Sequence, residues 1–336
     1  MNKKLLLLVC NIVSLCSASQ KRPEISLYID ECNIKNQRKT QEDFSACTID
    51  IKKGELLLAV FDGHSGKEVA LYMAQKVLEK FQYNLLCSLT EEQAFRKVFF
   101  ECEEHAIENL KGGSTALVVY VNNGVAHIAN VGDSRTVCGN TDEVLFATRD
   151  QTLAREDERN RVINAGGVIY RYKDPLDQQS GPWRINGLAM SRAIGGKWSK
   201  GKEVGREDVY LRAQQIIKIG MLETPFPLQQ WPNIALLKGL ECKPQIGQVI
   251  ADPEYEKHVL TDKHRWLILA TDGLWDDIAN QEAINLVQLY YDQKKSLAGI
   301  AQILAQYAIR RGAEDNITVF VVDLFNLCKK RVIEVS

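Results

Sequence analysis

Acidic residues stand at the ends of several short apolar segments of this 336-residue chain. Leu56–Phe61 runs directly into Asp62, and Asp272 stands two residues after the end of Leu267–Ala270. The other acids that precede or follow an apolar segment are Glu42, Asp43, Asp133 and Asp315. Carboxylates about 4 Å apart repel each other by roughly 4 kcal/mol per pair at an effective dielectric of 20, so several in one place require a cation or protonation.

The ligand atoms available around these acids favour a hard divalent cation. The sequence has no cysteine or histidine cluster at metal-ligand spacing, so oxygen atoms would be the ligands. Mg²⁺ and Mn²⁺ prefer oxygen ligands. Gly63 and Gly273 directly follow two of the acids, and a residue without Cβ can turn tightly and offer its carbonyl oxygen to a metal ion. A single Asp-Gly pair after a strand is most often an ordinary turn, but several strand-end acids in one chain favour a shared metal site.

These acids can meet only if the segments around them pair as antiparallel strands. Short stretches rich in aliphatic and β-branched residues predict strands over 44–51, 55–61, 115–121, 125–131, 135–138, 144–148, 266–271 and 317–324. Asn122-Asn123-Gly124 predicts a hairpin turn between two of them. In an antiparallel sheet, one strand exits at the edge where its neighbour enters, which would bring the acids together.

Capping residues and one-sided apolar spacing predict a set of helices. Their predicted starts are a capping box at Ser65 and Glu68, a second at Thr90 and Gln93, residue 154, Asn280 and Ser296. Strands follow one another and helices come in pairs, without the βαβ alternation of a parallel sheet. We therefore expect an α+β fold, a four-layer α-β-β-α sandwich in which helices flank two central antiparallel β-sheets.

Charge and composition exclude several classes of protein. The 42 Lys and Arg residues almost balance the 43 Asp and Glu residues, so the net charge is −1. Nucleic-acid binding driven by overall charge is therefore not expected. The apolar fraction of 45% and the charged fraction of 25% are globular averages, which exclude collagen-like, disordered and multispan membrane proteins. With no internal repeat or long linker, residues 20–336 are expected to form one domain.

The first 19 residues have the pattern of a secretory signal peptide. Lys3 and Lys4 precede an apolar run over Leu5–Cys16, and small residues follow before Gln20. The run is shorter than the roughly 20 residues that cross a bilayer, so no stable membrane span is expected. Cleavage would leave an odd number of cysteines at irregular spacing, which is unusual in an oxidising compartment. We expect the secretory pathway or secretion if the signal functions, with a cytoplasmic location as the alternative.

A series of motifs, in order along almost the whole chain, resembles the metal-dependent Ser/Thr protein phosphatases of the type-2C (PPM) class. Each motif alone would be weak, and their common order is what makes the resemblance strong. They are RKTQED from Arg38, FDGHSG from Phe61, GSTA from Gly113, NVGDSR from Asn130, Glu158-Arg159 with Ala165-Gly166-Gly167, NGLAMSRAIG from Asn186, TDGLWD from Thr271 and DNITV from Asp315.

The resemblance implies hydrolysis of phosphoserine and phosphothreonine in proteins by a water that bridges two Mg²⁺ or Mn²⁺ ions, without a phosphoenzyme. Asp62 would bridge the ions, which in two-metal sites lie about 3.5–4 Å apart. Gly63 and Glu42 would serve one ion, and Asp272 and Asp315 the other. In addition, Asp133 and Asp276 match acids that hold a third, weaker ion.

Two further residues acquire catalytic roles from the resemblance. Arg38 would clamp the phosphate oxygens of the substrate, a task suited to its forked guanidinium. His64 would protonate the departing serine or threonine oxygen. The partners expected are phosphoprotein substrates, with no nucleic acid, and the chain is expected to act as a monomer.

The sequence departs from the family pattern in a few places. Gly196 stands where the family commonly has Asp, and Gln151 stands where it has His. Loop insertions around 171–182 and 198–247 enlarge the phosphatase domain, and substrate choice is expected to depend on them.

Two alternatives to an active phosphatase remain. One is a pseudophosphatase that acts as a binding or regulatory module. The other is a phosphohydrolase with an aspartate nucleophile, which would want an Asp-x-Asp pair at the end of a parallel strand; the sequence shows neither feature.

Overall fold

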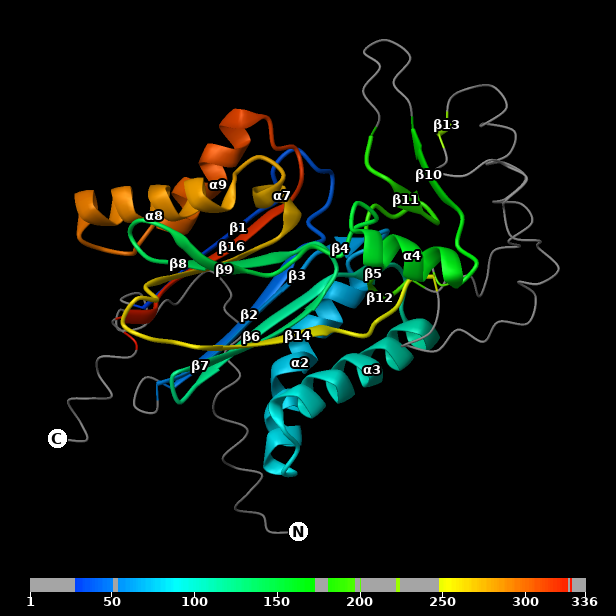
Figure 1. Ribbon diagram of the computed structural model, residues 1–336, viewed down its shortest axis with the longest axis horizontal. Helices are drawn as coiled ribbons and strands as arrows, with labels where there is room; N and C mark the ends of the chain where they lie inside the picture. Colours follow the sequence, from blue (N-terminus) through cyan, green and yellow to red (C-terminus); the bar gives the residue numbers. More distant parts are fainter. Residues whose placement is uncertain are drawn as a thin grey trace.

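Two five-stranded sheets lie against each other at the centre of the molecule (Figure 1). The computed structural model describes residues 28–50, 54–172, 181–196, 200, 222–223, 248–325 and 327. The first sheet has the order β1-β16-β15-β8-β9, with bounds Ile29–Ile34, Ile317–Asp323, Trp266–Ala270, Arg135–Gly139 and Val144–Ala147. The second has the order β14-β7-β6-β3-β2, with bounds Glu254–Val259, Val125–Val131, Ala116–Asn122, Glu55–Phe61 and Phe44–Asp50. Every pairing within them is antiparallel, as predicted.

Central strands are apolar on both faces because both faces are covered. Along β3, alternate residues point to opposite sides of the sheet. Leu57, Ala59 and Phe61 join the apolar cluster beneath the helices of the second sheet. Leu56, Leu58 and Val60 join the cluster between the two sheets. This double burial explains why the strand reads as a continuous apolar run rather than an alternating one.

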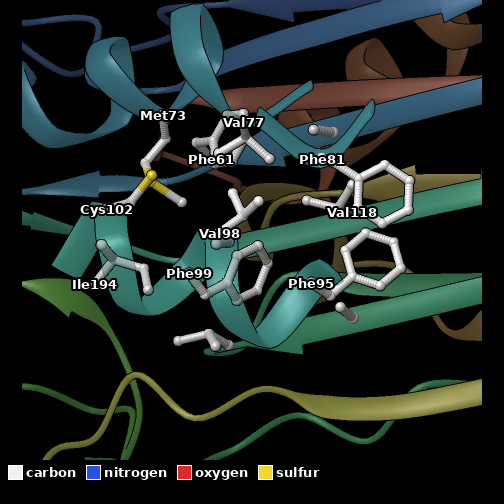
Figure 2. Packing of buried hydrophobic residues seen from close by; sticks show 14 of the residues in the cluster. Phe61, Met73, Val77, Phe81, Phe95, Val98, Phe99, Cys102, Val118 and Ile194 are labelled. Carbon is white, nitrogen blue, oxygen red and sulfur yellow. The ribbon is translucent and has the colours of Figure 1, made fainter. Parts of the chain in front are cut away.

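Helices cover the outer face of each sheet and complete the four layers that the sequence predicts (Figure 1). The second sheet is covered by α2 (Glu68–Leu86) and α3 (Glu91–Asn109), and the first by α7 (Asp272–Trp275), α8 (Asn280–Lys294) and α9 (Ile300–Arg311). Figure 2 shows how side chains of α2 and α3 interdigitate above β3 and β6. The rings of Phe81 and Phe95 stack there with centroids 4.1 Å apart, which locks the two helices together.

Two predicted helix starts, Ser65 and Ser296, are wrong, and the one at Thr90 is confirmed; α9 begins at Ile300 rather than at Ser296. Ser65 does not cap α2: the residue before the helix is Lys67, and no side chain caps it. Ser65 and Gly66 instead have positive φ angles, and this turn directs the Gly66 N–H to Glu42 Oε2 (3.2 Å). The capping box at Thr90 and Gln93 is present at the start of α3.

Smaller elements extend from one end of the sandwich. A lobe formed by α4 (Glu156–Asn164), β10 (Ile169–Tyr172), β11 (Arg184–Ile185) and β13 (Leu222–Glu223) has its own apolar cluster around Val162. Beside it, a short sheet has the order β12-β5-β4, with bounds Ile194–Gly195, Gly113–Ser114 and Gly63–His64.

Some parts of the chain lie outside the described residues, among them the predicted signal peptide over 1–19 and most of the predicted insertions at 171–182 and 198–247. The boundaries of the domain predicted over 20–336 and of its insertions therefore stay predictions. Within the described part of the chain, no helix combines the length and hydropathy needed to cross a membrane.

Candidate metal centre

Carboxylates from both sheets meet at one edge of the sandwich. Asp62 follows β3 of the second sheet, and Asp272 follows β15 of the first. Burial raises the pKa of Asp62 well above its ordinary value, and the charge of Asp272 raises it further. Each carboxyl group affects the pKa of the other through a side-chain interaction, so the two lie close together. The strand-end pattern thus leads to a direct contact between acids from different sheets.

Asp43 and Asp133 surround this pair and are buried with it. Thr271 Oγ1 and Thr318 Oγ1 each donate a 2.9 Å hydrogen bond to Asp43 Oδ2, which ties the entrance of β2 to β16 and to the residue that follows β15. Burial raises the pKa of Asp43 to about 7 despite these bonds. Burial, and next the charge of Asp272, likewise raises the pKa of Asp133 well above its usual range.

This edge fits divalent cations. Asp133 Oδ1 and Asp272 Oδ1 are shielded from solvent and accept no hydrogen bond from any described residue. Buried carboxylate oxygens normally have such a partner, and a cation provides one of the stabilising alternatives. Burial, followed by the charges of Asp276 and Asp315, raises the pKa of Asp272 to about 7, so these acids repel one another without added positive charge.

Two glycines allow the loops that carry the acids to approach each other closely. A Cβ on Gly63 would lie 2.5 Å from the carbonyl oxygen of Glu42, and one on Gly273 would lie 2.0 Å from that of Asn316. Neither glycine has a positive φ angle. Their role in the fold is therefore close backbone packing, whereas the sequence suggested a tight turn.

Arg38 reaches the site from the loop between β1 and β2. Its Nη2 donates to Asp315 Oδ2, and its charge opposes the rise in the pKa of Asp272. Asn316 holds this loop in place: its Nδ2 donates to the carbonyl oxygens of Lys35 (2.7 Å) and Thr40 (3.1 Å). The guanidinium is largely exposed, with a relative side-chain accessibility of 58%, so it is available to an incoming anion.

Glu42 precedes β2, and His64 lies in β4, shortly after β3. The Glu42 carboxylate accepts hydrogen bonds from Gly66 N and from Thr40 Oγ1 (2.8 Å). The ring nitrogens of His64 are shielded from solvent. Burial, helped by the charge of Lys200 and opposed by Glu42, lowers the pKa of His64 to about 4, so the ring is neutral near pH 7.

Asp276 lies at the end of α7. Its neighbours include Asp150, an acid that the site prediction did not include. Burial raises the pKa of Asp276, and the charges of Asp277 and Asp150 raise it further. Asp150 also raises the pKa of Asp133. Because Asp150 follows β9 as the other acids follow their strands, the same strand-end rule could have identified it. It forms an ion pair with Arg135, with contacts of 2.8 and 2.5 Å.

Another acidic group lies apart from this edge, at α4 and β14. In the described part of the chain, it is the one set of three acids whose ligand atoms all lie within 4.8 Å of one another: Asp157, Glu158 and Glu254. Arginines already neutralise it. Arg155 bridges Asp157 and Glu254, and Arg161 and Arg192 both bind Glu158. The predicted metal ligands are not in this group.

The sequence pattern of the protein phosphatase 2C family matches residues 28–317. The chain belongs to this family. It is 30% identical over 304 residues to "Probable protein phosphatase 2C member 13, mitochondrial" of rice, covering 86% of this chain and 66% of the relative. It is 29% identical over 306 residues to "Probable protein phosphatase 2C 52" of rice, covering 86% and 49%. The chain thus spans about half to two thirds of these relatives.

A solved structure supports the fold assignment. The crystal structure of serine-threonine phosphatase 2C from Toxoplasma gondii superposes with a TM-score of 0.62 at 18% identity, covering 88% of this chain and 94% of that one. At this identity, the likeness concerns the fold alone. It confirms the layered α+β architecture of the protein phosphatase 2C family for this chain.

Proposed function

We propose that the chain is a metal-dependent protein phosphatase that hydrolyses phosphoserine and phosphothreonine. The observation that carries the proposal is the contact between Asp62 and Asp272, from different sheets, in a buried acidic site beside Arg38. Membership of the protein phosphatase 2C family supports it.

The acids at this edge would hold two Mg²⁺ or Mn²⁺ ions. Asp62 would serve both ions, Glu42 and the backbone of Gly63 would serve one of them, and Asp272 and Asp315 would serve the other. When bound, the ions would lower the pKa of a bridging water and neutralise charge on the phosphoryl group. Around a third, weaker site stand Asp133 and Asp276.

Arg38 and His64 would act on the substrate itself. The guanidinium of Arg38 orients the phosphate through paired hydrogen bonds and remains charged throughout. His64 donates a proton to the departing alkoxide oxygen. Since its imidazole is neutral near pH 7 in the structure, we propose that the negative charge of the bound phosphate raises the pKa of His64 and lets it acquire that proton.

The site favours catalysis over the alternatives. A pseudophosphatase would be expected to have lost metal-binding acids, and every acid implied by the resemblance is present. An aspartate-nucleophile phosphohydrolase is disfavoured because the strands that lead to these acids pair antiparallel.

The proposal is tested by assaying the full chain with Mn²⁺ on a phosphothreonine peptide and on p-nitrophenyl phosphate. We expect hydrolysis of both substrates, its loss on chelation, and its loss in Asp272→Ala. Activity that survives chelation, or that Asp272→Ala leaves unchanged, would contradict the metal mechanism. Light scattering on the same sample should show a monomer.

We also propose that the first 19 residues direct the chain to the secretory pathway. Expression with a C-terminal tag should yield a lumenal or secreted form that lacks about 19 residues. An intact N-terminus in a cytosolic fraction would instead support the cytoplasmic alternative.

A further inference from the structure

A buried ion pair lies behind the candidate active site. Lys200 Nζ is 2.8 Å from Glu103 Oε1, and both residues are almost fully buried, with relative accessibilities of 3% and 1%. Glu103 belongs to α3, whereas Lys200 lies beyond β12. A buried pair of charges adds little net stability, because desolvation offsets the attraction between them. The pair must therefore be judged by what else it holds.

Each member of the pair also binds the backbone around β12. Glu103 Oε2 accepts a hydrogen bond from Gly195 N (2.6 Å), and Lys200 Nζ donates one to the carbonyl oxygen of Ala193 (2.7 Å). These two hydrogen bonds fix the backbone on both sides of Ile194. That side chain packs in the cluster with Phe99 of α3 (Figure 2). The ion pair and this packing fix β12 relative to α3.

From β12 the contacts lead directly to His64. In the short sheet, Gly195 pairs with Gly113, and Gly113 pairs with His64. A Cβ on Gly113 would lie 2.5 Å from Cε1 of the His64 ring and 3.0 Å from the carbonyl oxygen of Ile194. The imidazole ring and β12 therefore pack against the same glycine, and a displacement of β12 would disturb the ring.

We infer that the Glu103–Lys200 ion pair is a positioning device that holds His64 in its catalytic orientation through β12 and Gly113. The inference rests on the proposed function, in which His64 donates a proton to the leaving group. Neither residue touches the substrate in this scheme. Their effect should appear only where the leaving group needs that proton.

A comparison of two substrates separates this role from general structural support. The alkoxide of phosphothreonine leaves poorly without a proton, whereas p-nitrophenolate leaves readily without one. We expect Lys200→Met to lower kcat for a phosphothreonine peptide by about tenfold or more, since small displacements of a catalytic group are costly. The kcat for p-nitrophenyl phosphate should change by less than about twofold, because that step does not use His64.

A second variant covers the case in which an unpaired buried Glu103 unfolds the chain. The double substitution Glu103→Gln/Lys200→Met keeps the net charge. The glutamine side chain retains a carbonyl oxygen that can accept the hydrogen bond from Gly195 N. It should remain folded and show the same selective loss on the peptide. The matched control is Lys80→Met, which breaks a half-exposed ion pair between Lys80 and Glu101 on α3 and should leave both rates within about twofold.

A double-mutant cycle with His64→Ala then tests the route. If Lys200 acts through His64, adding Lys200→Met to His64→Ala should cause no further loss on the peptide. Equal losses on both substrates, an unchanged peptide rate in a folded variant, or full additivity with His64→Ala would each overturn the inference.

A readout that does not depend on activity separates this inference from the proposed function. A wild-type chain that hydrolyses neither substrate with Mn²⁺ would contradict the proposed function. The NMR signals of the His64 ring, assigned with His64→Ala and recorded at a pH where the ring is neutral in every variant, should still shift in the charge-neutral double variant and stay unchanged in Lys80→Met. Unshifted ring signals in a folded double variant would overturn the positioning role in either case.

Discussion

Two clusters of acids in this molecule, each with a buried carboxylate, have opposite electrostatics. At the sheet edge, burial raises the pKa of Asp43 and that of Asp272 to about 7. Beside α4, the pKa of Glu158 is lowered to about 2: burial acts to raise it, but Arg192 and Arg161 together outweigh that effect. Glu158 and Asp43 are equally inaccessible, at 2% and 1%. Burial alone therefore does not decide the direction of the shift.

The difference lies in the source of the positive charge. The α4 cluster contains its own arginines, which bind the Glu158 carboxylate from two sides. The sheet-edge cluster brings several carboxylates together with Arg38 at its margin, and two of its buried oxygens accept no hydrogen bond from the described residues. Closely spaced acids are thus a poor sign of a metal site, because here the tighter group is already neutralised. Acids that lack a counter-charge are the better sign.

Asp272→Asn is the substitution expected to have the largest effect. Loss of this ligand should lower kcat with Mn²⁺ by about a thousandfold, since bound metal contributes several kcal/mol of charge stabilisation. In chelator, the same variant should be at least as stable as the wild type, because a repelling charge is gone. Enzyme assays and thermal unfolding measure the two effects. Asp262→Asn, on the exposed surface, is the control, and a strong loss of metal-free stability in Asp272→Asn would contradict the comparison.

Glu158→Gln should behave in the opposite way. It leaves Arg161 and Arg192 partly buried without their counter-charge, so the free energy of unfolding should fall by about 3 kcal/mol. Urea denaturation measures this change. Asp157→Asn removes an exposed acid from the same cluster and should cost less than about 1 kcal/mol. If the two substitutions lowered the free energy of unfolding equally, the arginine network would not depend on the buried carboxylate of Glu158.

Added Mn²⁺ should stabilise one cluster only. At a free concentration one hundred times the dissociation constant, a single site adds about 2.7 kcal/mol to the free energy of unfolding. We expect this gain in the wild type and in Glu158→Gln, and a clear reduction of it in Asp272→Asn. Thermal unfolding with and without Mn²⁺ checks it. Stabilisation that survives in Asp272→Asn but disappears in Glu158→Gln would place the metal in the α4 cluster and contradict the proposed site at the sheet edge.

The pH dependence of stability should have two limbs with different causes. Without metal, Asp43 and Asp272 keep protons up to about pH 7 in the folded chain but lose them near pH 3.8 when unfolded, so stability falls as pH rises between these values. Glu158 contributes stability that is complete above about pH 4.5 and is lost as pH falls towards 2. Denaturation measured across pH should show both limbs, and Mn²⁺ should abolish the fall in stability as pH rises towards 7. A fall that persists with Mn²⁺ would argue against a metal at these acids.

Local sequence was enough to predict the central strands and the acids at their ends. β3 and β7 have the predicted bounds, because each is a short apolar segment between strong turn signals. The edge strands β1 and β14 were missed. Their sequences, IDECNI and EYEKHV, carry polar and charged residues that an edge position tolerates and that no apolar pattern reveals.

The sequence by itself determined the central strands and the long helices, since periodicity, caps and breakers act over a few residues. It also determined that several acids stand where strands end. Only the tertiary structure decided which carboxylates meet, which acquire arginine partners, and which distant residues pair, as Glu103 and Lys200 do. The physical reason is that burial and counter-charge depend on contacts between segments far apart in the chain, and these contacts set the pKa and the orientation of each group.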